Sequence, residues 1–268
     1  MTGKVWFVGA GPGDPELLTV KGRRLLEEAG AILYAGSLVD QAATLFGPPG
    51  CVIRDSKDMT LEEMSAWLLD QSARHATVVR LQTGDPGLYG ALVEMTRPLT
   101  AAGIEWAVVP GVSSAFAAAA AAGETLTLPE VTQTVILTRV AGRTPMPPGE
   151  ELEALAAHRA TLCIFLSITL LHEVQRALRA AGWAEDAPIL VVQKASWPGE
   201  EKIVRGTLAD IKQRCQAGKI ASQAMIIASP ALGAADWPTL ARSKLYDPAF
   251  AHRFRKATVA APNSETSA

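Results

Sequence analysis

The chain has 268 residues, of which 49% are hydrophobic and 19% charged, and its formal net charge is −2. This composition is typical of a globular enzyme and excludes a disordered chain, while the small net charge argues against a general nucleic-acid-binding protein. Three widely spaced cysteines match neither a disulfide framework nor a zinc site. The length allows one large or two medium domains.

Two segments bear on the cellular location. Residues 1–8 lead directly into an apolar strand and lack the parts of a signal peptide, so we expect a soluble cytoplasmic protein. The alanine-rich run at 114–123 is about half as long as the ~20 residues that a membrane span requires. No membrane attachment is therefore expected.

The first 110 residues alternate apolar strands with helical patterns. We expect strands at 4–8, 31–34, 77–81 and 104–109, and helices at 15–28, 61–74 and 89–102. Asp14 can cap the first of these helices. This alternation predicts an α/β fold with a mostly parallel sheet and helices on its faces.

The first strand ends in a glycine turn, Gly9-Ala10-Gly11-Pro12-Gly13. Such a turn can bind a dinucleotide phosphate, but Pro12 lacks an amide donor and no acidic residue follows the second strand. We favour a turn that lets a flat substrate approach the backbone. A purely structural turn and a nicotinamide site are the alternatives.

Two further glycine turns follow the third and fourth strands, at Thr83-Gly84-Asp85-Pro86 and Pro110-Gly111-Val112-Ser113-Ser114. Asp85 can cap the next helix, accept hydrogen bonds from a ribose or attract a cation. The serines can cap a helix or bind a ligand carboxylate. Because ligands gather at the carboxyl ends of parallel strands, the three turns together predict one shared binding crevice.

The second half has more closely spaced strands, expected at 134–139, 161–166, 189–192, 202–204 and 224–228, with helices at 167–181 and 208–216. We place the domain boundary between residues 111 and 128. The predicted division is an N-terminal α/β domain at 1–120, a C-terminal α/β domain at 121–240 and an extension at 241–268, whose last part is expected to be flexible.

The sequence offers little support for a hydrolytic active site or for a metal site. The four histidines have no metal-binding spacing, and neither a Ser-His-Asp set nor a G-x-S-x-G motif is present. We expect no metal site.

The three glycine turns, in this order and spacing, resemble the signatures of the tetrapyrrole (corrin/porphyrin) methylase family, and the likeness extends from residue 1 to about 235. Within that family, the segments 34–39, 55–60, 128–134 and 138–145 resemble precorrin-4 C11-methyltransferases. The uroporphyrinogen methylases have Tyr-Asp where this chain has Tyr34-Ala35, which argues against a uroporphyrinogen substrate.

The resemblance implies two α/β domains with S-adenosylmethionine in the interdomain cleft, and a homodimer. The implied reaction is methyl transfer to carbon 11 of precorrin-4 in cobalamin (vitamin B12) biosynthesis, giving precorrin-5. The implied cofactor contacts are Pro12, Gly84, Asp85, Leu88, Ser113, Ser114, Leu166, Ala195 and Ala224.

The implied substrate is a macrocycle that carries many carboxylates, which arginine binds well. The predicted substrate contacts are Gly11, Gly13, Lys57, Arg80, Arg139 and Arg143, although ordinary surface charge is an equal alternative for each basic residue. Orienting two reactants can supply ~7–11 kcal/mol, so an activated methyl donor needs no protein nucleophile. Asp85 and Tyr34 are the candidate general bases.

Two alternatives remain open at this stage. One is methylation of another carbon of a precorrin or cobalt-precorrin, and the other is a non-catalytic protein that binds the tetrapyrrole or the cofactor. The sequence also leaves open whether the substrate contains cobalt.

Overall fold

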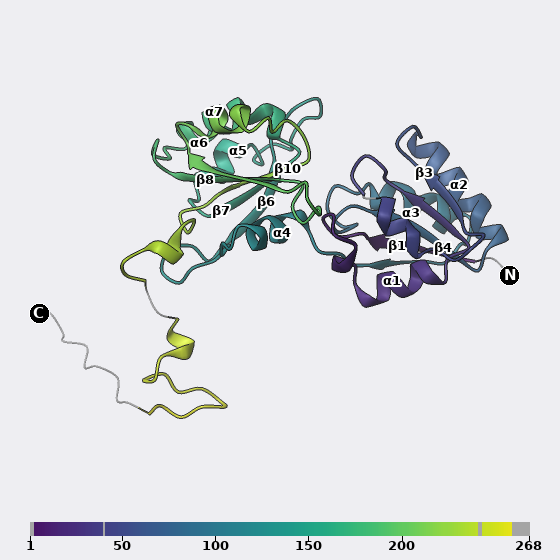
Figure 1. Cartoon of the computed structure of the whole chain (residues 1–268), viewed down its shortest axis with the longest axis horizontal. Coiled ribbons are helices and arrows are strands. Elements are labelled where there is room, and N and C mark those ends of the chain that lie inside the picture. The colour runs from purple at the N-terminus through teal and green to yellow at the C-terminus, as the bar shows by residue number, and fades with distance from the viewer. Residues whose placement is uncertain (1–2, 40, 241–242, 259–268) are drawn as a thin grey trace, which may run out of the picture.

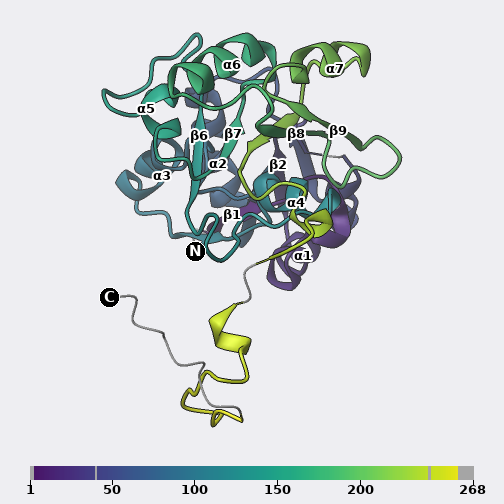
Figure 2. The same ribbon diagram turned by 90° about the vertical axis from the view of Figure 1, so that its left-hand side faces the viewer.

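The computed structural model describes residues 3–39, 41–240 and 243–258, which form two α/β domains and a C-terminal segment (Figure 1). Much of residues 243–258 extends away from both sheets, as the view in Figure 2 also shows. The residues after 258, including the predicted flexible end, lie outside the described residues.

The first domain contains a five-stranded parallel sheet of order β3-β2-β4-β1-β5. Its strands are β1 (Lys4–Gly9), β2 (Ala31–Tyr34), β3 (Val52–Asp55), β4 (Thr77–Gln82) and β5 (Trp106–Val109). Its helices are α1 (Val20–Glu27), α2 (Leu61–Arg74) and α3 (Leu92–Ala101). Because β4, β1 and β5 are neighbours and run in one direction, the three glycine turns that follow them meet at one edge of the sheet.

Alternating side chains of these strands form two apolar layers. Val8 and Leu81 pack with Leu26 of α1, whereas Phe7 packs with Leu68 of α2 and Leu99 of α3 on the other face. The sheet is therefore covered on both faces, as a parallel sheet requires.

The second domain contains a five-stranded mixed sheet of order β6-β7-β10-β8-β9. Its strands are β6 (Val135–Arg139), β7 (Thr161–Phe165), β8 (Pro188–Gln193), β9 (Lys202–Thr207) and β10 (Ala224–Ala228), and its helices are α4 (Ser114–Ala121), α5 (Leu152–Ala156), α6 (Leu171–Ala180) and α7 (Ile211–Ala217). The mostly parallel sheet expected from the first 110 residues is confirmed in the first domain, whereas the second sheet is mixed, because β10 lies between β7 and β8 and is antiparallel to both. The alternation of strands and helices along the chain does not indicate that a later strand, β10, lies between two earlier ones.

Helix α4 packs on the second sheet. Ala115 and Ala118 are fully buried in a cluster with Leu190 of β8 and Met225 of β10, on the face opposite α5, α6 and α7 (Figure 1). A division at residue 120 would cut this helix, so we propose that the boundary lies before Ser114.

Several element limits differ from the predicted ones for local reasons. The helix expected at 15–28 is split into a 3-10 turn at Pro15–Leu17 and α1, whose start is capped by Thr19 through a 3.0 Å bond from the Gly22 N–H to its Oγ1. The helix expected from residue 89 begins at Leu92, because Tyr89 and Ala91 have left-handed φ angles of 55° and 49°.

Two elements, β3 and α5, were not predicted. Strand β3 lies at the edge of its sheet, where it pairs with β2, and its residues are largely exposed. Its sequence therefore lacks the apolar pattern by which a buried strand is recognised. Helix α5 spans only 5 residues, too few for a helical period to stand out.

The environments of the cysteines predict their reactivity. Burial raises the pKa of the Cys163 thiol to about 12 and that of Cys215 to about 11. At pH 8 about one in a thousand or fewer of these thiols is ionised, and only the thiolate reacts quickly. We expect iodoacetamide to leave both unlabelled in native protein at pH 8, by peptide mass spectrometry, and to label them in denaturant. Rapid labelling of native Cys163 would contradict the packing described.

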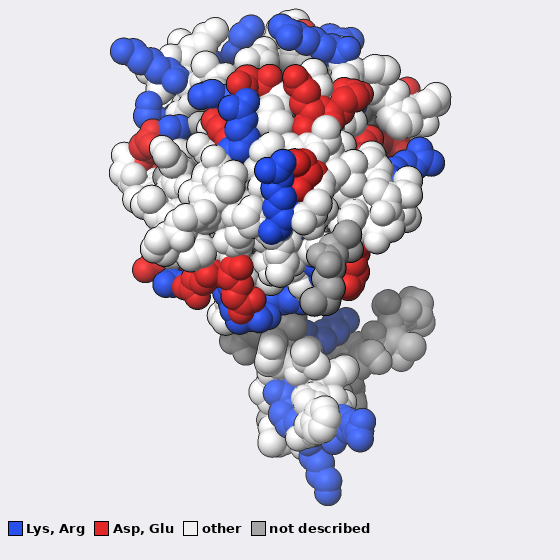
Figure 3. All heavy atoms as spheres, turned by 90° about the vertical axis from the view of Figure 1, so that its right-hand side faces the viewer, with Lys and Arg blue, Asp and Glu red and all other residues white. Residues whose placement is uncertain are grey.

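The surface of the first domain mixes both signs of charge. On the face in Figure 3, basic and acidic side chains lie next to one another, and no broad basic patch is seen there. Its helices carry ion pairs of opposite charge, such as Arg23–Glu27 and Arg74–Asp70. Among the described residues, no helix is both long and apolar enough to cross a membrane.

Candidate functional site

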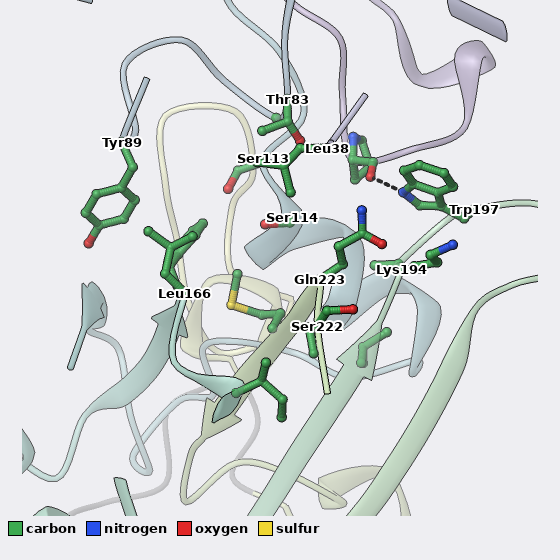
Figure 4. Close-up of a pocket in the computed structure, with 18 of the residues that line it drawn as sticks. Leu38, Thr83, Tyr89, Ser113, Ser114, Leu166, Lys194, Trp197, Ser222 and Gln223 are labelled. Atoms are coloured by element: carbon green, nitrogen blue, oxygen red, sulfur yellow. Dashed lines mark hydrogen bonds between the residues drawn. The ribbon is translucent and has the colours of Figure 1, made fainter. Parts of the chain in front are cut away.

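A cavity of about 380 Å³ lies between the two domains, within the usual range of ligand sites (Figure 4). Turns at the carboxyl edge of the first sheet form one wall, and α4 with the ends of β7, β8 and β10 forms the other. All nine residues predicted to contact the cofactor line this cavity: Pro12, Gly84, Asp85, Leu88, Ser113, Ser114, Leu166, Ala195 and Ala224.

The three glycine turns touch through their backbones. A Cβ atom built on Gly111 would lie 2.0 Å from the Gly84 carbonyl oxygen and 2.8 Å from the Gly9 Cα, and one built on Gly9 would lie 2.5 Å from the same oxygen. Gly11 and Gly84 are also paired, since the Gly84 N–H donates to the Gly11 carbonyl at 2.7 Å. Gly9 and Gly111 therefore have no room for a side chain, and the convergence predicted from the sequence is present.

Asp85 ties two of these turns together. Its Oδ1 accepts a 2.8 Å bond from the Gly87 N–H, and its Oδ2 accepts a 2.9 Å bond from the Gly111 N–H. Both carboxylate oxygens are thus engaged by backbone donors at the cavity wall. This geometry favours a structural tether over the predicted role as a general base.

The two serines occupy the start of α4. Ser113 is buried, and its Oγ accepts a 3.3 Å bond from the Ala115 N–H, so it caps the helix. Ser114 lies at the first position of α4 and lines the cavity, as Figure 4 shows. The cavity thus borders a helix N-terminus, which favours negative charge.

The second domain supplies most of the apolar lining. Leu166 projects into the cavity and is 65% exposed, and Met225 also lines the cavity. Tyr89 and Phe165 meet across the cleft with ring centroids 5.4 Å apart. Four lining residues, Tyr89, Leu166, Lys194 and Gln223, have left-handed φ angles, a strained state that often marks functional sites.

Sequence reasoning missed several lining residues, among them Leu38, Thr83, Tyr89, Phe165, Lys194, Trp197, Ser222 and Gln223. Thr83 begins a predicted turn and Tyr89 follows it, so both could have been found from it. Phe165 ends β7 and the other members come from loops, and none of these segments carries a glycine signature, so only the folded chain places them here.

The predicted substrate contacts lie outside the cavity lining. Gly11 pairs with Gly84, as described, and Gly13 lies under the Trp197 ring, where a Cβ would meet the ring carbon Cδ1 at 2.0 Å. Lys57 is exposed and forms an ion pair with Asp55 at 3.5 Å.

Arg80 is the most buried of the basic residues predicted to contact the substrate, with only 5% of its surface exposed. Its Nη1 donates to the Leu33 carbonyl at 3.3 Å and to the Ser56 Oγ at 3.0 Å. Burial lowers the pKa of Arg80 to about 10, against the opposing effect of the nearby Asp55 carboxylate. Arg80 therefore links β4 to the ends of β2 and β3 through hydrogen bonds.

Arg139 and Arg143 differ in the contacts of their guanidinium groups. Arg139 donates to the carbonyls of Val140, Thr144 and Pro145, at 3.3, 3.1 and 2.7 Å, and so organises the loop after β6. Arg143 is exposed in that loop and makes no hydrogen bond or ion pair within the described part of the chain. Of the two, Arg143 is the more available to a ligand.

Tyr34, the second candidate base, is half-buried and packs against the apolar core of the first domain. Its side chain does not belong to the lining of the cavity. The structure thus brings Asp85 and the cofactor contacts together but leaves Tyr34 apart from them.

The lining suits an organic ligand of mixed polarity. Leu88, Leu166 and Met225 offer apolar contacts. The close-packed glycine turns present backbone N–H and C=O groups, because glycine has no side chain to cover them. Lys194 is engaged in an ion pair with Glu200. Among the described residues, no group of three or more His, Cys, Asp or Glu side chains could hold a metal ion.

Comparison with known protein families gives a match over residues 4–212, to the model described as tetrapyrrole (corrin/porphyrin) methylases. A cobalt-precorrin-4 C(11)-methyltransferase of Priestia megaterium is 49% identical, with 94% of this chain and 98% of the relative aligned. A precorrin-4 C(11)-methyltransferase of Pseudomonas aeruginosa is 44% identical, with 94% and 98% aligned.

Two solved structures are similar to this chain. A cobalt-precorrin-4 methyltransferase has a TM-score of 0.83 and 49% identity, over 85% of this chain and 95% of that one. Uroporphyrin-III C-methyltransferase of Thermus thermophilus, solved as a complex with S-adenosylhomocysteine, has a TM-score of 0.70 and 30% identity, over 86% and 99%.

Proposed function

The chain belongs to the tetrapyrrole methylase family, and we propose from this premise that its interdomain cavity is the site of an S-adenosylmethionine-dependent C-methyltransferase. The reaction is methyl transfer to carbon 11 of precorrin-4 in cobalamin biosynthesis, giving precorrin-5. The observation that carries the assignment is the backbone contact of three glycine turns at the cavity wall, in a chain 49% identical to a cobalt-precorrin-4 C(11)-methyltransferase.

The donor supplies an activated methyl group on a sulfonium, so the protein's task is to bind and orient. Asp85 holds the turns at Gly87 and Gly111 in register through its two backbone bonds. The apolar side chains of Leu166 and Met225 line the cavity and offer no hydrogen-bond partners to water there. Such positioning is sufficient for a large rate enhancement when the reacting atoms are held in line.

The individual contacts stay predictions. We propose that the nine lining residues named above bind the cofactor and that Gly11, Gly13, Lys57, Arg80, Arg139 and Arg143 serve the substrate. The exposed, unpaired guanidinium of Arg143 supports its part in this set, whereas the internal bonds of Arg80 and Arg139 support an indirect effect through loop structure.

Assembly and location are also proposals. We propose a homodimer, for which a measured mass of about twice 28.3 kDa by sedimentation is the test. This proposal rests on the resemblance to the family. A cytoplasmic location, expected from the sequence, remains a prediction.

The reaction is tested by methyl transfer. Purified full-length protein is incubated with S-adenosylmethionine carrying a ¹³C-methyl group and with precorrin-4 or cobalt-precorrin-4, and the product is analysed by NMR. We expect one new labelled methyl, at carbon 11, and the preferred acceptor shows whether cobalt is required. A methyl at another carbon would support the first alternative, and cofactor binding without transfer to any precorrin would support a binding protein.

A further inference from the structure

The loop after β8 reaches across the cleft to the first glycine turn. The Trp197 Nε1–H donates to the Pro12 carbonyl at 2.9 Å, as drawn in Figure 4, and the Ser196 Oγ accepts from the Asp14 N–H at 3.1 Å. These two bonds join residues that are more than 180 positions apart in the chain. They connect the two domains directly beside the cavity.

Gly13 provides the space for this contact. A Cβ on Gly13 would lie 2.0 Å from Trp197 Cδ1 and 2.4 Å from its Nε1, so the indole lies directly on the glycine backbone. Gly13 does not have a left-handed φ angle, and the requirement for glycine here is therefore one of space alone.

The loop that carries Trp197 is braced from its own domain. Lys194 and Ser196 have φ angles of 48° and 67°, and the Lys194 ammonium lies 4.7 Å from the centre of the Trp197 ring. The Lys194 N–H donates to the Gln223 carbonyl at 2.8 Å. Gln223 in turn donates from Nε2 to the Ser37 carbonyl at 2.7 Å, so a second bridge between the domains is coupled to the first.

On the opposite side of the cavity, the described residues form no hydrogen bond between the domains. Figure 4 shows Tyr89 and Trp197 on opposite sides, and Tyr89 meets the second domain by the ring contact with Phe165. An aromatic ring contact can separate without leaving unpaired donors, whereas separation on the Trp197 side would break three inter-domain hydrogen bonds. The inter-domain hydrogen bonds beside the cavity are thus concentrated on the Trp197 side.

We propose that Trp197 is a positioning residue that holds the Gly9–Gly13 turn at a fixed distance from the second domain, and that the cleft opens on the Tyr89 side. Trp197 acts through Pro12, whose carbonyl it orients at the cavity wall. This inference rests on the proposed function, because it takes the cavity as the binding site of the methyl donor.

The first test compares two matched tryptophans. Trp197→Phe removes the 2.9 Å bond to Pro12, and Trp106→Phe removes a 2.9 Å indole bond to the Thr100 Oγ1 away from the cavity. We expect Trp197→Phe to weaken S-adenosylhomocysteine binding and lower kcat by about fivefold or more, with the KM for precorrin-4 nearly unchanged, since one hydrogen bond is lost at the cofactor wall. Trp106→Phe should match the wild type.

Equal calorimetric affinities and equal kcat values for the two variants would overturn the proposal. If the wild type itself bound no S-adenosylhomocysteine, the proposed function would fail and the inference with it. The two failures are therefore distinguished by the wild-type titration alone.

A second test uses the space at Gly13. Gly13→Ala should impair cofactor binding in the wild-type background because its methyl group collides with the indole. In a Trp197→Ala background the same change should add little, since the ring is gone; this non-additivity is the signature of direct contact. An equal loss in both backgrounds would contradict the proposal. Thermal melting shows whether each variant is folded. If Trp197→Ala does not fold, the comparison of Trp197→Phe with Trp106→Phe decides the question by itself.

Discussion

Gly111→Ala is expected to lower kcat/KM about 100-fold, the loss typical of a misplacement near 1 Å at an active site. A Cβ at this position would lie 2.0 Å from the Gly84 carbonyl oxygen and 2.8 Å from the Gly9 Cα, and neither neighbour is a flexible side chain. The turns after β1, β4 and β5 must therefore separate. Steady-state methyl transfer and calorimetric titration with S-adenosylhomocysteine measure the effect.

The matched control is Gly218→Ala, at the end of α7. A Cβ there has ordinary contacts of 3.4 Å or more, and the backbone is helical with φ −75°, so alanine is accommodated. We expect wild-type activity from this variant. Wild-type activity from Gly111→Ala as well would show that the close contact of the three turns is unnecessary for the reaction.

Removal of the Asp85 carboxylate should have the second largest effect. Asp85→Ala leaves the Gly87 and Gly111 N–H groups without their acceptors, and an unsatisfied donor costs about 1–3 kcal/mol. We expect kcat/KM to fall at least about tenfold, together with a weaker affinity for S-adenosylhomocysteine. Both quantities are measured on the same preparations.

The affinity for S-adenosylhomocysteine separates a general-base role of Asp85 from its roles as a tether of the cavity wall and as a cofactor contact. This product undergoes no reaction, so a general base would contribute nothing to its binding, whereas a tether of the cavity wall would. Asp85→Asn sharpens the comparison, because its amide group presents a donor to one of the two backbone N–H groups. Unchanged affinity with a lost kcat in both variants would favour the general base predicted from the sequence.

Much of the first domain could be predicted from the sequence. Strand β2 and helix α2 begin and end at the predicted residues, and β1 and β4 differ by one residue. These are buried or amphipathic segments, in which the apolar period is strong. The exposed edge strand β3 has no such period, so no sequence pattern indicated a strand there.

The candidate site was predictable to the extent that its residues lie in local motifs. The turns at Gly9–Gly13, Thr83–Pro86 and Pro110–Ser114 follow neighbouring parallel strands, so their meeting follows from the fold class. The contacts expected in the second domain, Leu166, Ala195 and Ala224, came from family resemblance, and all three line the cavity. Composition and periodicity alone point to none of them.

The roles of the charged residues were harder to predict. Arg80 and Arg139 were expected to serve the substrate, yet the folded chain gives both guanidinium groups backbone carbonyl partners. A charged residue at a strand end has the same sequence signature whether it faces a ligand or the protein. Its hydrogen-bond partners are decided by neighbours far away in the chain.

The sequence by itself determined the family, the two α/β units and the glycine turns, because each is encoded in a few consecutive residues with restricted backbone choices. Only the tertiary structure decided that β10 enters its sheet antiparallel, that Asp85 bonds to Gly111, and that Trp197 lies on Gly13. These features depend on contacts between distant segments, whose free energies come from packing and hydrogen bonds formed when the chain has folded.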